Sequence, residues 1–337
     1  MTTTDSSPPL VVRGAAGLLA TIPTTLGFHP RDSLVQVCLY GTRDRVGPMG
    51  RVDLEPPAGH PRTDYQAGVI DTLLTVARRH AERIVLVWYR DGPLRRPPLV
   101  SALSRALARA GIPVIDVVRV GDGRYHSERH GDGMDPWARP KTDPAAAEHP
   151  DVGRMRAAAA LRGRTVLTDR DGLRRAIAGP SPGPLLAAAQ EAFGRRAATA
   201  PPGLTAYRAV LETALGECER RGDPPVDLCA EVVQGLDDAA LCEYVVARAV
   251  GDRSRPWSAL LAACARATPD RHAGDLCALL ALVCYCEGDG ALAQVAVDRS
   301  LECRSGHSMA RLMLQVMAAG IDPEVVTAHF RDAGLGA

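Results

Sequence analysis

The chain has 337 residues, 46% of them hydrophobic and 23% charged, so it is long enough for two domains and apolar enough to bury a core. These values exclude a wholly disordered chain and a small disulfide-stapled protein. Forty basic and 39 acidic residues leave a formal charge of +1, which gives the chain as a whole no attraction to nucleic acid or to an anionic membrane. No apolar run approaches the roughly 18 residues of a membrane span.

The first third of the chain predicts an α/β domain. A short helix over 14–22 is expected to end at Pro23, and strands at 34–40 and 46–54 are expected to form a hairpin. Four further elements then alternate between helix and strand: 64–80, 84–88, 99–110 and 113–120. Thr63 or Asp64 is available to cap the first of these helices. Strand, helix, strand at this spacing indicates a parallel crossover unit in a mixed sheet.

Residues 121–150 are polar and rich in Gly, Pro, His and Asp, which predicts a loop. A helix over 152–161, one more strand at 164–167 and a helix over 170–178 are expected to follow. Prolines at 180, 182 and 184 exclude a helix there. The remaining chain predicts only helices: 185–196, 204–221, 226–234, 239–250, 257–267, 274–286, 291–303, 308–318 and 323–330.

The predicted organisation has four parts. A flexible tail at 1–12 precedes the α/β domain at 13–180, and a proline-rich linker region with a short helix, 181–203, leads to an all-helical domain at 204–337. The last helices are about a dozen residues long and joined by short polar turns. This pattern is typical of helical hairpins, as in tetratricopeptide repeats, or of a compact helical bundle.

The cysteines indicate a reducing compartment. Eight of the nine follow residue 217, on segments with helical periodicity, and the polar residues 1–9 do not resemble a signal peptide. An odd number of cysteines without an export signal predicts buried, reduced thiols in the cytoplasm. Cys284 and Cys286 form a Cys-x-Cys pair, but residues two apart point to different faces of a helix. We therefore expect structural cysteines rather than zinc ligands there.

Two common functional motifs are missing and a third lacks its context. The single lysine, Lys141, follows proline and makes no phosphate-binding loop, and no spaced glycines follow the strand that ends near Tyr89. These absences argue against nucleotide cofactors. Residues 179–183 match the Gly-x-Ser-x-Gly pattern of hydrolases around Ser181. A helix rather than a strand is expected to enter this segment, so a linker is favoured.

One cluster of candidate site residues flanks the predicted hairpin. His29, Asp32 and Ser33 precede the first strand, and Arg51 and Asp53 end the second. A hairpin that brings Asp32 near Arg51 or Asp53 makes an acid–base or ion-pair cluster at a strand end, where sites of α/β domains gather. The structural alternative is a turn capped by Asp32 and a salt bridge between Arg51 and Asp53.

Two further candidates are weaker. His126 and His130 lie in the polar segment 121–150 and are potential metal ligands, but no third ligand has a fixed spacing from them. Residues 78–119 hold nine arginines against three acidic residues, which hints at an anion or nucleic-acid surface. Aromatic side chains for base stacking are nearly absent there, so nucleic acid is not favoured. The arginines that would carry such binding are Arg78, Arg79, Arg83, Arg95 and Arg96.

The run Leu-Gly-Phe-His-Pro-Arg-Asp-Ser-Leu-Val at 26–35, followed by Gly-Arg-Val-Asp-Leu at 50–54, resembles the actinobacterial family called domain of unknown function 4192. The segment 288–299 is similar to the closing region of that family. The resemblance adds Gly27, Phe28 and Pro30 to the candidate cluster as family motif residues, without assigning a role to any of them. Relatives are expected to carry a small cysteine cluster in the region after Gly123 and Arg124, whereas this chain has no cysteine between Cys38 and Cys218.

These observations favour a non-enzymatic cytoplasmic interaction or regulatory protein whose helical domain presents a groove to a protein partner or to a second copy. The alternative is a hydrolase, with a metal or without one, that acts at the cluster of His29, Asp32, Ser33, Arg51 and Asp53. No cofactor, partner identity or reaction follows from the sequence.

Overall fold

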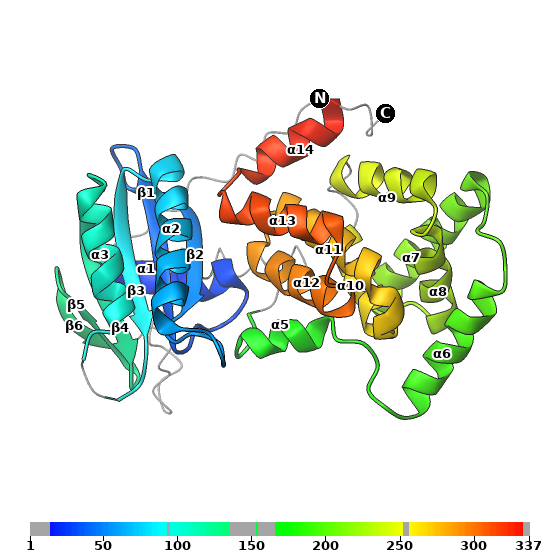
Figure 1. Cartoon of the computed structure of the whole chain (residues 1–337), viewed down its shortest axis with the longest axis horizontal. Coiled ribbons are helices and arrows are strands. Elements are labelled where there is room, and N and C mark those ends of the chain that lie inside the picture. The colour runs from blue at the N-terminus through cyan, green and yellow to red at the C-terminus, as the bar shows by residue number, and fades with distance from the viewer. Residues whose placement is uncertain (1–13, 93–94, 135–152, 154–165, 252–255, 333–337) are drawn as a thin grey trace. The chain divides into compact units, whose positions relative to one another are not determined.

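The computed structural model describes residues 14–92, 95–134, 153, 166–251 and 256–332. They divide into two compact units, Met1–Asp169 and Arg170–Ala337, whose elements are labelled in Figure 1. The first unit contains a mixed sheet with helices, and the second contains only helices among its described residues. The predicted fold class is therefore confirmed. No helix in these ranges is both long and apolar enough to cross a membrane.

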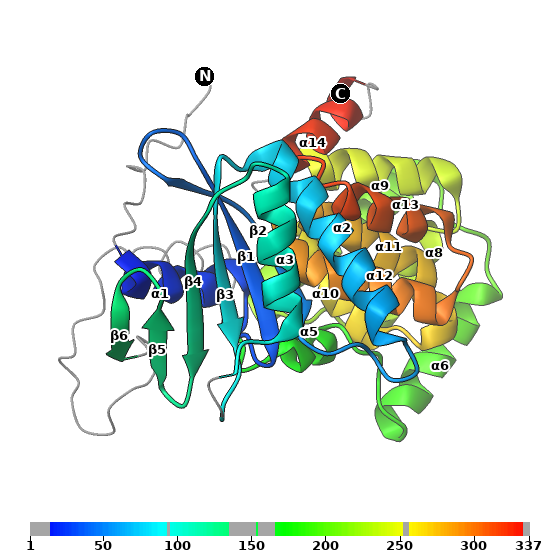
Figure 2. The same cartoon turned by 60° about the vertical axis from the view of Figure 1, so that its left-hand side comes forward.

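The first unit is built on six strands in the order β2-β1-β3-β4-β5-β6 (Figure 2). Its elements are α1 (Gly14–Leu26), β1 (Ser33–Tyr40), β2 (Arg45–Asp53), α2 (Arg62–His80), β3 (Arg83–Tyr89), α3 (Pro98–Arg109), β4 (Val114–Gly121), β5 (Arg124–Ser127) and β6 (Gly131–Met134). β1 runs antiparallel to both β2 and β3. β3 and β4 are parallel and joined through α3, which confirms the predicted hairpin and crossover unit.

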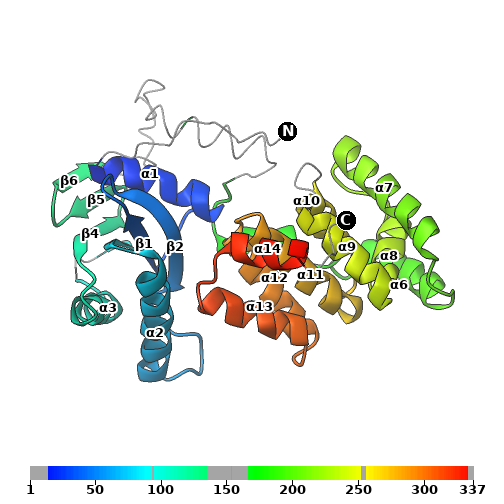
Figure 3. The ribbon, with the colours of Figure 1, turned by 90° about the horizontal axis from the view of Figure 1, so that it is seen from above.

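Helices cover both faces of this sheet. α1 lies on one face, and α2 and α3 lie on the other (Figure 3). Alternate residues of a strand point to opposite faces, so Leu34 of β1 packs with Leu86 and Leu103 beneath α2 and α3, while Val35 and Val37 turn to the other side. All five side chains are fully buried. This two-sided burial explains why the central strands read as continuous apolar runs.

Three local predictions were wrong. α1 continues through Pro23 to Leu26, because Ile22 and Leu26 are both buried and packing on either side of a proline outweighs its missing N–H. The residue that precedes α2 is Pro61, whose side chain cannot cap, and Asp64 lies in the first turn instead. Residues 124–134 form the hairpin of β5 and β6 rather than a loop. The predicted helix at 152–161, except for residue 153, lies outside the described residues, as do positions 164 and 165 of the predicted strand. Leu167 of that strand makes a single parallel bridge with Phe28.

The second unit is a bundle of helices joined mostly by short turns. Its elements are α5 (Arg170–Ala176), α6 (Pro184–Ala197), α7 (Leu204–Arg221), α8 (Val226–Gly235), α9 (Ala239–Gly251), α10 (Trp257–Ala267), η1 (Asp270–His272), α11 (Ala273–Cys286), α12 (Gly290–Cys303), α13 (Ser308–Ala318) and α14 (Pro323–Asp332). α11 is buried along almost its whole length and contacts α9, α10, α12, α13 and α14. α11 and α12 form a helical hairpin whose turn is capped by Asp289, which accepts from the Leu292 N–H at 3.0 Å.

The boundary between the units lies between Asp169 and Arg170, before α5, whereas the sequence places it after residue 180. Two arginines of the bundle account for the difference. Arg266 of α10 donates to the Ala176 carbonyl at 2.9 Å, and Arg299 of α12 donates to the Ile177 carbonyl. These bonds attach the end of α5 to helices about 90 and 120 residues away in the sequence, an attachment that local composition does not encode.

Candidate functional site

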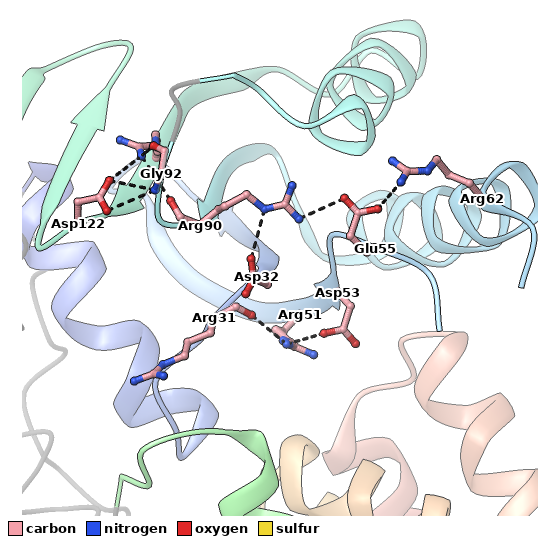
Figure 4. A network of polar contacts seen from close by, with 10 residues as sticks. Arg31, Asp32, Arg51, Asp53, Glu55, Arg62, Arg90, Gly92 and Asp122 are labelled. Carbon is pink, nitrogen blue, oxygen red and sulfur yellow. Dashed lines mark hydrogen bonds and ion pairs between the residues drawn. The ribbon is translucent and has the colours of Figure 1, made fainter. Parts of the chain in front are cut away.

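Four strand ends meet at one end of the sheet in the first unit, and each carries charged residues (Figure 4). Ser33, the first residue of β1, pairs with Asp53 at the end of β2 and with Tyr89 at the end of β3. β4 ends beside β3, because the two strands are parallel. Ligands of open α/β sheets bind at the carboxyl ends of parallel strands, so this end of the sheet is the first place to look for a site.

A chain of ion pairs crosses this end of the sheet. Arg90, directly after β3, pairs with Asp32 at 3.3 Å and with Glu55 at 3.2 Å. Glu55 also pairs with Arg62 in the first turn of α2 at 2.6 Å. Asp32 has a φ of 40°, in the left-handed region, and its carbonyl accepts from the Leu54 N–H at 2.9 Å. Left-handed backbone at a non-glycine residue costs on the order of 1 kcal/mol and is concentrated at functional sites and tight turns.

Arg51 forms a separate ion pair. Its guanidinium lies 2.7 Å from the Asp53 carboxylate, donates to the Arg31 carbonyl at 3.4 Å and lies 5.9 Å from the centre of the Phe28 ring. The Arg51 side chain is only 12% exposed, whereas Asp53 is open to solvent. Arg51 therefore ties the segment before β1 to the end of β2, and Phe28 of the family motif supplies the surface on which it rests.

The ends of the two parallel strands are tied by a third set of contacts. Arg119 of β4 donates to the Gly92 carbonyl at 2.6 Å and pairs with Asp122 at 3.2 Å. Asp122 in turn accepts from the Gly92 N–H at 3.2 Å, and its own N–H donates to Asp91 at 2.7 Å. Arg119 was counted among the nine arginines of 78–119 but was not placed at this site, and Asp122 was missed, since its signal in the sequence is an Asp-Gly dipeptide after a strand.

The structure thus brings the five candidate residues to one end of the sheet, where Arg51 and Asp53 form an ion pair with each other but Asp32 pairs with neither of them. Asp32 pairs with Arg90 instead. The Ser33 hydroxyl is fully buried and has no hydrogen-bond partner among the described residues. His29 is half-buried, and its backbone N–H donates to the Leu167 carbonyl at 3.1 Å. The single hydroxyl among these five side chains, that of Ser33, is therefore not accessible as a nucleophile.

A model for the family described as Domain of unknown function (DUF4192) matches residues 16–324 of the chain. The chain belongs to the DUF4192 family. The match extends from α1 into α14, so both units are part of the DUF4192 architecture. No curated protein and no solved structure matches the chain.

The two histidines proposed as metal ligands in this DUF4192 chain lie on the β5–β6 hairpin and have separate partners. His126 of β5 pairs across the ladder with Asp132 of β6, at 2.5 Å. His130, in the turn, lies 3.3 Å from Asp116. Within the described ranges, no three His, Cys, Asp or Glu side chains are arranged to hold a metal ion. The predicted loop at 135–150 lies outside those ranges.

Asp116, Ser127 and His130 form a contact trio that has the composition of a catalytic triad but not its geometry. Ser127 Oγ donates to Asp116 Oδ2 at 2.6 Å and accepts from the backbone N–H of His130 at 2.8 Å. A single ring nitrogen, His130 Nδ1, lies 3.3 Å from both oxygens. In a triad the serine and the carboxylate contact different ring nitrogens, and the serine is accessible. Ser127 is buried, so the trio fixes the turn of the hairpin instead.

The arginines proposed to bind nucleic acid in DUF4192 are partly engaged by carboxylates. Arg83 pairs with Asp44 at 2.5 Å, and Arg96 pairs with Glu128 at 3.1 Å. Arg78 and Arg79 lie in the last turn of α2, where they complement the helix dipole. Salt bridges of this kind reduce the positive charge that these side chains offer to phosphates.

The thiols of the DUF4192 chain are protected by burial. Cys277, Cys284 and Cys286 of α11 are all buried, as expected. Burial raises the pKa of Cys277 to about 12, and it raises the pKa of Cys38 to about 11 although a hydrogen bond with Gln36 opposes the change. Such thiols stay protonated at neutral pH and are poor nucleophiles and metal ligands.

The Gly-x-Ser-x-Gly segment of the DUF4192 chain borders a cavity of about 500 Å³ in the helical unit. Ser181 is exposed and lies between α5 and α6, so no strand enters it, as the linker interpretation requires. Gly179 lies against Arg299, and a Cβ at this position would come within 2.9 Å of the Thr268 carbonyl oxygen. The segment therefore forms part of a wall that Arg299 holds in place.

Proposed function

We propose that this DUF4192 protein is a non-enzymatic interaction protein whose helical unit binds an apolar segment of a protein partner. The observation that carries the proposal is the 500 Å³ cavity beside α6 and α12. Support comes also from the first unit, where the charged residues of the family motif pair with one another across strand ends. Ion pairs of this kind connect neighbouring strand ends, as expected of a scaffold.

The cavity has the composition of a peptide-binding groove. Ile177, Leu186 and Val295 supply apolar walls, and Arg174 and Glu302 supply charges at its rim. Leu185, the neighbour of Leu186 in the chain, is 77% exposed. Apolar anchors of a partner bind in pockets of this kind, while a polar rim sets orientation and excludes the wrong partners.

The groove is preformed, because the Arg299 side chain fixes its floor. Arg299 is 9% exposed, and besides the Ile177 carbonyl it donates to the carbonyls of Ala265 at 2.8 Å and Thr268 at 3.1 Å. Its ion pair with Asp270 measures 3.1 Å. A rigid site loses less conformational entropy on binding than a flexible one, which favours affinity.

We also propose that the protein works in the cytoplasm of an actinobacterium. All nine cysteines are free thiols, and a reducing compartment keeps them so. The source is the one that the family resemblance implies, and the abundance of arginine, alanine and proline is consistent with a genome rich in G and C.

A matched pair of leucine substitutions tests the groove. The test variant combines Leu185→Asp with Leu186→Asp and so places two negative charges at the groove. The control variant, Leu312→Asp, introduces a negative charge at an exposed leucine of α13 that does not line the groove; this leucine is 57% exposed. The tagged wild-type chain, expressed in the source organism, is expected to retain a stoichiometric partner whose chemical cross-links map to α6 and α12. The double variant should lose this partner and the Leu312 variant should keep it, with circular dichroism unchanged in both.

Three results would contradict the proposal. They are purification of the chain alone and monomeric, cross-links that avoid α6 and α12, and loss of the partner in the Leu312 variant only. The hydrolase alternative stays a prediction. Turnover of ester or phosphoester substrates that disappears in an Asp32→Asn variant, with the fold intact, would favour it instead.

A further inference from the structure

A second cavity in the helical unit differs from the groove in being lined mainly by polar side chains. It has a volume of about 290 Å³ and lies among α6, α8, η1, the first turn of α11 and the end of α12. Three arginines, two aspartates and a histidine line it: Arg196, Arg271, Arg304, Asp237, Asp275 and His272. None of them was singled out from the sequence, because they come from four separate segments.

An aromatic pair forms one wall of this polar cavity. The ring of His272 stacks on Phe193 of α6 with centroids 5.1 Å apart and an angle of 22° between the planes. Arg271 Nε donates to His272 Nε2 at 2.9 Å, so this nitrogen carries no proton and the imidazole is neutral. Burial lowers the pKa of His272, which favours the same neutral form. The wall therefore presents a flat, uncharged ring next to a guanidinium.

Most charges of the cavity are already balanced. Arg304 pairs with Asp275 at 2.6 Å, and Arg196 pairs with Glu231 of α8. Arg271 and Asp237 remain, and among the described residues neither has an ion-pair partner of opposite sign within 4.0 Å. Burial and the nearby Asp275 raise the pKa of Asp237, although His272 and Arg304 oppose the change.

We infer that this cavity binds a small zwitterion, a free α-amino acid, with the ligand carboxylate on Arg271 and the ligand ammonium on Asp237. Arg271 and Asp237 are both exposed to the solvent that fills the cavity, and one unpaired cation with one unpaired anion suits a ligand that carries both charges. A simple anion would satisfy Arg271 but would be repelled by Asp237, and a simple amine would leave Arg271 unbalanced. Arginine matches a carboxylate with two parallel hydrogen bonds, which makes it the preferred partner for that end of the ligand.

The size and walls of the cavity agree with such a ligand. Small-molecule sites range from about 300 to 1,000 Å³, so a cavity of about 290 Å³ takes a ligand at the lower limit of that range. Phe193, His272 and Val233 provide apolar or flat surface for the amino-acid side chain. The site is separate from the proposed partner groove except for Cys303, which lines both cavities.

The test is a binding screen with matched ligands. Each of the standard L-α-amino acids is titrated into the full chain at pH 7.5 and followed by calorimetry and by the shift in Tm. The amine that lacks the carboxylate and the acid that lacks the ammonium are titrated in parallel. At least one amino acid is expected to bind, about tenfold or more tightly than either matched compound, because each lost charged hydrogen bond removes at least that factor.

Two variants assign the two ends of the ligand. Arg271→Gln and Asp237→Asn should each weaken binding of that amino acid by about tenfold or more, whereas Arg311→Gln, an exposed arginine on α13 that does not line the cavity, should leave it unchanged. Any of three results overturns the inference: no amino acid binds, the matched acid binds as tightly as the amino acid, or both variants retain wild-type affinity. The screen does not depend on a protein partner, so its outcome is independent of the groove proposal.

Discussion

The Arg119 guanidinium lies 5.6 Å from the centre of the Trp88 ring while it donates to the Gly92 carbonyl at 2.6 Å. The two residues face each other in the register of the parallel strands β3 and β4. A single side chain thus joins the end of β4 to the backbone that follows β3. This contact adds a side-chain link to the backbone ladder that already pairs the two strands.

Replacement of Arg119 by lysine should destabilise the protein by about 1–3 kcal/mol, because lysine keeps the charge but loses the planar fork that stacks on Trp88 and reaches two acceptors. Urea unfolding of the two chains measures the difference. Arg105→Lys on the exposed face of α3 is the matched control and should change stability by less than about 0.5 kcal/mol. Equal stability of both variants would show that the Arg119 contacts contribute nothing.

Substitutions at Asp32 should follow backbone conformation rather than charge. Its φ of 40° favours glycine, and its ion pair with Arg90 is exposed and therefore weak. We expect Asp32→Gly to be at least as stable as the wild type and Asp32→Ala to be about 1 kcal/mol less stable than Asp32→Gly. Thermal and urea unfolding test this order. An alanine variant as stable as the glycine variant would contradict it.

Arg299→Met should destabilise the helical unit by about 3 kcal/mol or more, because it removes a donor from three buried carbonyls and leaves Asp270 without its partner. Hydrogen exchange should increase first at residues 177–183, which Arg299 holds. Arg311→Met removes an exposed arginine of the same unit and serves as the control. Unchanged exchange at 177–183 would show that the segment is fixed by other contacts.

Stability should fall as the pH rises from 9 to 11. The thiol of Cys38 has an unfolded pKa of 9.0 and a folded pKa of about 11, so the folded chain binds more protons than the unfolded chain in this interval. By pH 11 this thiol should cost on the order of 2 kcal/mol of stability. Cys38→Ala should flatten the measured pH dependence of the free energy of unfolding by a comparable amount. An identical slope in wild type and variant would contradict the prediction.

The sequence predicts the central strands and their helices well because apolar periodicity encodes them directly. β5 and β6 were missed because each has four residues, and their ladder is made by backbone groups beneath polar side chains such as His126 and Asp132. No hydrophobic pattern indicates such a hairpin. The ends of the helices in the second unit were predicted to within two residues, since turn residues such as glycine and proline separate most of them.

The candidate site was predicted only in part, for a physical reason. The pairing of Arg51 with Asp53 follows from two positions on one strand face, which the sequence shows. The pairing of Asp32 with Arg90 depends on β1 lying beside β3, and this order of strands is a property of the whole sheet. The same holds for the polar cavity, whose residues meet only after four segments of the bundle have packed.

The two outermost strands of the described sheet are both poor templates for another strand. β2 carries Gly47 and Pro48 where its register with β1 shifts, and proline has no N–H to offer a neighbour. β6 at the other side has only four residues, two of them glycine. Copies of the chain are therefore not expected to join by strand addition, and any assembly of this protein should rely on contacts between helices.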